Sequence, residues 1–178
     1  MKIQTATIAR LRDALLQSGR RPSLIESPAY ETLARRGLLS PEETAALERI
    51  DPIGEVMYLM MAADGQIGAE EKDAVRGAIR GLTGNLLRSG TIESMLSRYA
   101  TRIQEQGRDA RLHQVAETLS EVPVEAESAF SLAAAVALAD DRVADEENEF
   151  INQLAEWFGL TRERADEILD ELEEDNAG

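Results

Sequence analysis

Two short acidic segments, 64–71 and 140–147, carry the side chains with the clearest capacity for chemistry. Carboxylate oxygens are the ligands that hard divalent cations such as Ca²⁺, Mg²⁺ and Mn²⁺ prefer over softer donors. If the two segments meet in space, their carboxylates could converge on such a cation. The ligands expected first are Asp64, Glu71, Asp140 and Glu147. Those expected to contribute less are Glu70, Asp141 and Glu146.

The same carboxylates also have a purely structural use. Asp64 and Asp140 stand at the C-terminal ends of their expected helices, where a negative charge faces the negative end of the helix dipole at a cost of a few tenths to about 1 kcal/mol. Each could accept hydrogen bonds from amides at the start of the next helix. Glu71 and Glu147 could then act as capping-box residues at the third helical position. Taken alone, the residues favour this capping interpretation, which needs no ligand.

The segment from Asp64 to Glu71 has the spacing of the second half of an EF-hand calcium loop. In that register the first and third ligand positions fall on Met60 and Ala62, whose side chains cannot coordinate calcium. The second segment fails in the same way, at Val136 and Leu138. A cation site would therefore have to combine carboxylates from both segments, and we expect its binding to be weak or assisted by a partner.

Other kinds of site lack their residues. The chain has no cysteine, which excludes disulfides, thiolate metal sites and a cysteine nucleophile. His113 is the one histidine, so histidine-based metal sites and Ser-His-Asp triads are incomplete, and we expect it to be structural or solvated. The paired glutamates lie at expected helix starts, where the helix dipole favours the charged carboxylate over the protonated form that a general acid needs. We therefore expect a protein that is not an enzyme.

The net charge of −15 is unevenly distributed. Residues 1–50 carry eight Lys/Arg and six Asp/Glu, whereas the remainder carries eleven and twenty-eight. An acidic body repels nucleic acid and attracts cations and protein partners with basic surfaces. The arginine pairs at 20–21 and 35–36 are expected on the solvated surface. A second use for them is to bind the acidic face of a partner or of another copy, which would make a homo-oligomer.

The longest apolar stretch, from Ala129 to Ala139, has eleven residues, and a membrane-spanning helix needs about 20. No apolar segment typical of an export signal follows Met1. We therefore expect a cytoplasmic protein with no membrane span, in which the stretch forms a buried core helix.

Helix signals recur along the chain, and the alternating patterns of strands are absent. The first expected helix ends before Gly19, and a short one follows at 27–37. Ser40 and Glu43 form a capping box for the next helix. The Asp-Pro pair at 51–52 is expected to end that helix and to open another.

The mostly apolar segment 53–63 is typical of a helix buried on most of its faces. Residues 173–178 are acidic or small and are expected to fray. Six helices are expected between residues 63 and 173. The first is amphipathic and runs through Leu82, and two more lie near 91–105 and 108–120. An alanine-rich helix from Pro123 to about Ala139 follows, then one that ends at Gly159 and one capped by Thr161.

A shift of 76 positions superposes two parts of the sequence. Residues 63–67 fall on 139–143, and the glutamate pair at 70–71 falls on the pair at 146–147. Each unit consists of a buried helix, an acidic turn and an amphipathic helix. Because one unit cannot cover its own apolar helix, we expect the two to pack as a pseudo-symmetric pair. The matching apolar positions are Val56 with Leu132, Met60 with Val136, Val75 with Ile151, Ala78 with Leu154 and Leu82 with Phe158.

The segment Ala62–Glu71 resembles the Ala-Asp-Gly-x-Ile-x-x-x-Glu signature of the TerB (tellurite-resistance) family, and Leu138–Glu147 resembles its second copy. The resemblance covers roughly residues 53–172. Asp141 departs from it, because it stands where glycine is usual. The resemblance implies a compact helical fold, a bacterial stress-response or tellurite-resistance context, and an acidic surface that binds cations.

We therefore expect an all-α bundle of about eight to ten helices, with 53–63 and 129–139 at its centre. The expected parts are a helical extension at 1–50, a TerB-like domain at 51–172 and an acidic tail at 173–178. The expected function is a non-enzymatic stress-response module with an acidic surface that binds a divalent cation or docks a partner. The alternative is a structural or scaffolding protein whose acidic turns are helix caps and hold no metal.

Overall fold

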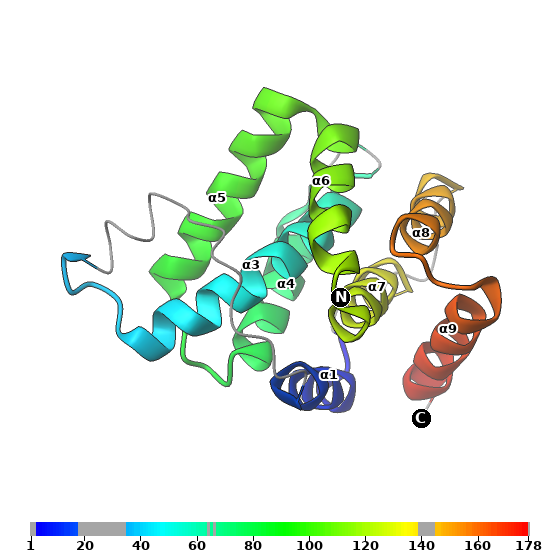
Figure 1. Ribbon diagram of the computed structural model, residues 1–178, viewed down its shortest axis with the longest axis horizontal. Coiled ribbons are helices and arrows are strands. Elements are labelled where there is room, and N and C mark those ends of the chain that lie inside the picture. Colours follow the sequence, from blue (N-terminus) through cyan, green and yellow to red (C-terminus); the bar gives the residue numbers. More distant parts are fainter. Residues whose placement is uncertain (1–2, 18–34, 64, 66, 139–144, 178) are drawn as a thin grey trace.

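The computed structural model describes residues 3–17, 35–63, 65, 67–138 and 145–177, and over these ranges the chain is helical with no strand (Figure 1). This confirms the all-α class. Most of the short helix expected at 27–37 lies outside the described residues. The helices are α1 (Thr5–Gln17), α3 (Pro41–Met61), α4 (Ala69–Leu82), α5 (Ser89–Gln106), α6 (Arg108–Ser120), α7 (Pro123–Leu138), α8 (Asp145–Trp157) and α9 (Arg162–Ala177).

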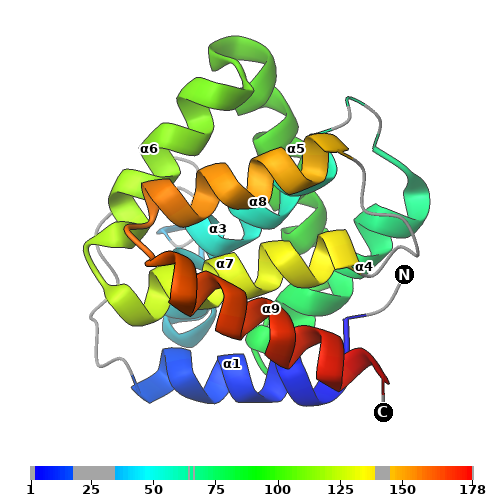
Figure 2. The same ribbon diagram turned by 90° about the vertical axis from the view of Figure 1, so that its right-hand side faces the viewer.

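Helices α3 and α7 pack against each other at the centre of the molecule, as the sequence predicts. Helix α3 also contacts α4, α5 and α6, whereas α7 contacts α1, α6, α8 and α9. In Figure 2, α7 is seen between α8 and α9, which both pack against it. Residues 129–137 of α7 are all buried. Because most of them are alanines, the backbones of the neighbouring helices can approach α7 closely.

Helix α3 continues through Pro52, so the boundary expected at 51–52 is wrong. Pro52 has no N–H to donate to the carbonyl of Glu48, and an interior proline typically costs a helix about 3 kcal/mol. Residues 50–61 are all buried, and the carbonyl of Asp51 accepts a hydrogen bond from Tyr99 Oη at 2.9 Å. Tertiary packing on both sides of the proline therefore outweighs the local signal.

The predicted N-terminal caps of α3 and α9 are confirmed. Ser40 Oγ accepts from Glu43 N at 3.1 Å, and the Ser40 N–H donates to Glu43 Oε2 at 2.7 Å. Thr161 Oγ1 accepts from Arg164 N at 3.2 Å at the start of α9. Gly159, after α8, has the positive φ of 67° that this C-terminal position favours.

The fraying expected after residue 172 is not found, because α9 runs to Ala177. Its last turns are tied to α1: Asp175 Oδ2 accepts from Thr7 Oγ1 at 2.9 Å, and Arg10 lies 3.3 Å from a carboxylate oxygen of Glu171. The domain boundary expected at 50–51 falls inside α3. Within the described ranges, no helix is both long and apolar enough to cross a membrane.

At Gly54, α3 packs closely against Tyr99 of α5. A methyl group at Gly54 would lie 2.6 Å from Tyr99 Oη, and Tyr99 is fully buried. We expect Gly54→Ala to lower the free energy of unfolding by about 1–3 kcal/mol, because the Tyr99 ring would have to give up its hydrogen bond or shift.

Gly77 in α4 is the matched control, because it is exposed and a methyl group there meets nothing within 4 Å. Gly77→Ala should raise the free energy of unfolding by about 0.5–1 kcal/mol through helix propensity alone. Urea denaturation of both variants checks the pair. Equal stabilisation by the two substitutions would show that Gly54 is not a packing constraint.

Candidate functional site

The predicted cation ligands are only partly described. Asp64, Asp140 and Asp141 lie outside the described residues, and so does the side chain of Glu70. Among the residues that are described, no three histidine, aspartate or glutamate side chains are placed to hold a metal ion. The described members of the predicted set are Glu71, Glu146 and Glu147.

Glu71 caps helix α4. Its Oε2 accepts a hydrogen bond of 2.6 Å from the backbone N–H of Gly68, three residues earlier, which is the geometry of a capping box. This confirms the capping interpretation for one oxygen of Glu71. Glu147 occupies the equivalent third position of α8, which begins at Asp145.

A polar pocket of about 220 Å³ opens where the end of α3, the start of α6 and the first turns of α8 meet. Ala63, the residue before Asp64, lines this pocket, and so does Glu146, the residue before Glu147. The pocket thus brings together chain positions next to both acidic segments. Its full lining is Ala63, Arg108, Asp109, Glu146, Glu149, Phe150 and Gln153, and we call it the acidic pocket.

Sequence analysis missed two carboxylates of the acidic pocket. Glu149 lies three residues after Glu146, so the two share one face of α8, and this spacing could have indicated it. Asp109 stands far from both acidic segments in the sequence and reaches the pocket because α6 packs against α3. No sequence signal connects Asp109 to them.

Arg108 places a positive charge inside the acidic pocket. Its Nη1 donates to the carbonyl oxygen of Ala63 at 2.9 Å, and its Nε lies 3.2 Å from Asp109 Oδ1. The guanidinium carbon also lies 5.7 Å from the centre of the Phe150 ring, a cation–π distance. Arg108 therefore satisfies a carbonyl at the C-terminal end of α3, where the helix dipole favours a cation.

A second set of charged side chains lies between α3, α5 and α6, and its carboxylates are buried. Glu55 is 1 % exposed and accepts two hydrogen bonds from Arg111, from Nε at 2.8 Å and Nη2 at 2.9 Å, and a third from Arg102. Asp51, one turn earlier on α3, lies 3.4–3.5 Å from donors of Arg98 and Arg102. We call these five residues the buried ion cluster.

The electrostatics of this cluster favour the charged form of Arg102. Burial acts to lower the pKa of Arg102, but the carboxylates of Glu55 and Asp51 outweigh that effect, and the net pKa is raised. Arg111 therefore shares the carboxylate of Glu55 with Arg102, which stays charged. The cluster joins α5 and α6 to α3, and it lines a further pocket of about 240 Å³.

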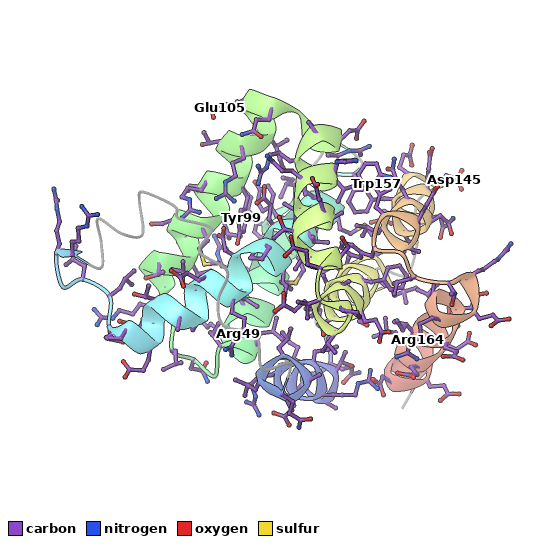
Figure 3. The ribbon with its side chains drawn as sticks, viewed as in Figure 1. Arg49, Tyr99, Glu105, Asp145, Trp157 and Arg164 are labelled. Atoms are coloured by element: carbon purple, nitrogen blue, oxygen red, sulfur yellow. The ribbon has the colours of Figure 1, made fainter. Side chains whose placement is uncertain are left out.

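His113 lies on α6, as the sequence predicts, and is exposed. Its ring meets Trp157 of α8 edge-on, with the ring centres 5.3 Å apart. Figure 3 shows Trp157 between α6 and α8. Through this contact His113 takes part in the packing of α6 against α8 at the surface of the bundle.

We expect Glu55→Gln to lower the free energy of unfolding by about 3 kcal/mol, because the carboxylate of Asp51 alone would then remain in the cluster to offset its three arginines. Glu105→Gln, at an exposed position of α5, is the matched control and should change it by no more than about 0.5 kcal/mol. Urea denaturation followed by far-UV circular dichroism measures both. A loss no larger than the control's would refute a structural role for the cluster.

Comparison with known proteins gives one match. The family model described as tellurite resistance protein TerB matches residues 53–170. The matched range begins within α3, directly after Pro52, and ends within α9. None of the curated proteins and none of the solved structures compared with the chain matches it.

Proposed function

The chain belongs to the TerB tellurite-resistance family, and from this premise we propose that it is a non-enzymatic module whose acidic pocket binds a hard divalent cation weakly. One observation carries the proposal: the pocket is lined from both sides by residues next to the predicted acidic turns. Asp109 and Glu149 would add to the ligands predicted from the sequence, of which Glu146 lines the pocket. Oxygen donors suit Ca²⁺, Mg²⁺ or Mn²⁺.

The charge around the pocket supports cation binding. Helix α8, whose residues line one side of the pocket, contains five Asp/Glu and no Lys/Arg. A surface with this excess of one sign raises the local concentration of cations. The same surface would favour a protein partner with basic side chains, and Arg108 supports this extension because a guanidinium already occupies the pocket.

We also propose that the two helix–turn–helix units are pseudo-symmetric. Helix α4 begins at Ala69 and α8 at Asp145, which are 76 positions apart and so match the sequence offset. Glu71 and Glu147 both occupy the third position of their helices. A repeated turn would supply carboxylates from two equivalent places to one site.

A second candidate function is structural, and the capping bond of Glu71 favours it. In that case the acidic turns stabilise helix starts, and the protein acts as a scaffold for other proteins with no metal. The two functions differ in what they require of Glu146 and Glu149, because neither residue is needed for the Glu71 cap.

We expect Mn²⁺ to broaden amide NMR signals in a saturable way near 63, 109 and 145–150. The variant Glu146→Gln/Glu149→Gln should weaken this binding by roughly tenfold, equivalent to about 1.4 kcal/mol of lost attraction. Glu163→Gln/Glu173→Gln, at exposed positions of α9, removes the same charge elsewhere and is the control. Competition with Mg²⁺ and Ca²⁺ ranks the metals, and Asp64→Asn/Asp140→Asn tests the predicted turn residues.

Broadening that never saturates and spreads along α8 and α9 would contradict the cation site and leave the scaffold function. Equal weakening by the control variant would show that the ion follows net charge rather than the acidic pocket.

Arg108 should compete with the cation for the acidic pocket. We expect Arg108→Gln to raise Mn²⁺ affinity about fivefold, the effect of removing about 1 kcal/mol of repulsion between a unit charge and a divalent cation roughly 8 Å apart in a water-like medium. Arg162→Gln, at the exposed start of α9, is the charge-matched control. Unchanged or weaker binding by Arg108→Gln would mean that Arg108 does not share the pocket with the ion.

A further inference from the structure

An apolar pocket of about 470 Å³ lies between α1, α3 and the turn that follows α4, away from the acidic pocket. Its volume and largely apolar lining are typical of sites for small molecules. The apolar lining includes Leu15 and Leu16 of α1, Ala46 and Ile50 of α3, and Leu82 and Leu86 at the end of α4 and beyond.

Two leucines at this pocket are unusually exposed. Leu16 is 60 % exposed and Leu86 is 50 % exposed, and they are two of the four large exposed hydrophobic side chains in the described part of the chain. Exposed apolar side chains gathered around a hollow mark a place where an apolar group binds. Burial of these side chains would supply the driving force for an apolar occupant.

Positive charge accompanies the apolar lining. Arg12 and Arg49 both line the pocket, and Glu42 is the one acidic residue described in its lining. Figure 3 places Arg49 on α3 beside α1. The described residues give Arg49 no ion-pair partner, and Arg12 pairs only with its neighbour Asp13, at 3.3 Å. The lining thus has a net positive charge in a protein whose net charge is −15.

From these features we infer that the pocket binds an apolar-tailed carboxylate, such as a medium-chain fatty acid. The tail would lie among the leucines, and the carboxylate would pair with Arg49, with Arg12 as the second cation. Charge complementarity distinguishes this ligand from a neutral one, because guanidinium groups recognise carboxylates through paired hydrogen bonds. The inference shares no residue with the acidic pocket and is independent of the cation proposal.

The experiment is a calorimetric titration of the full chain with octanoate, decanoate and dodecanoate, each below the concentration at which it forms micelles. We expect one saturable site whose affinity rises about fourfold for each added methylene, as apolar burial dictates. Dodecanol, which lacks the charge, should bind roughly tenfold more weakly than dodecanoate. Amide NMR should place the shifts at 12–16, 45–50 and 82–86.

Two variants test the pocket directly. Arg49→Gln should weaken dodecanoate binding roughly tenfold and leave dodecanol binding unchanged. Leu86→Glu should weaken both ligands, and because Leu86 is half exposed the variant should keep the circular dichroism of the wild type. The controls are Arg162→Gln and Leu38→Glu: Arg162 is exposed, Leu38 is 56 % exposed, and neither lines the pocket.

Binding that is insensitive to tail length, or equal effects of the pocket and control variants, would overturn the inference. Absence of saturable binding would overturn it too. Dimerisation seen by sedimentation would assign it to a second copy.

Discussion

The buried carboxylate of Glu55 is the constraint on which much of the rest depends. A carboxylate that is 1 % exposed is tolerated only when its charge is compensated and its oxygens accept hydrogen bonds. Arg102 of α5 and Arg111 of α6 supply both, so these helices must meet α3 in one register. Arg108 lies three residues before Arg111 on α6. The register that pairs Arg111 with Glu55 therefore also brings Arg108 to the carbonyl of Ala63, at the end of α3.

Helix α7 provides the other half of the framework. Its buried run of alanines packs against α3 on one side and carries α8 and α9 on the other (Figure 2). The first turns of α8 meet the end of α3, so Glu146 and Glu149 line one small pocket together with Asp109. The acidic pocket is thus a product of two packing interfaces, one set by ion pairs and the other by small apolar side chains.

The two pockets differ in chemistry and lie at opposite ends of the buried part of α3. Arg49 and Ile50 line the apolar pocket, and Ala63 lines the acidic one, a separation of about 20 Å at 1.5 Å per residue. Acidic residues are concentrated in α8 and α9, whereas the apolar pocket has two arginines in its lining. This separation gives one small bundle two pockets whose linings are opposite in net charge.

The helical class, the two central helices, the caps at Ser40 and Thr161, and the family could all be predicted from the sequence. The caps depend on residues within about four positions of each other, and the buried helices depend on the spacing of apolar residues. Both patterns can be seen directly in the sequence. Three features are seen only in the folded protein: α3 passes through Pro52, Asp51 and Glu55 meet arginines 47 to 56 positions away, and Asp109 joins the acidic pocket. Such long-range pairings have no local signature, because they depend on how the helices pack.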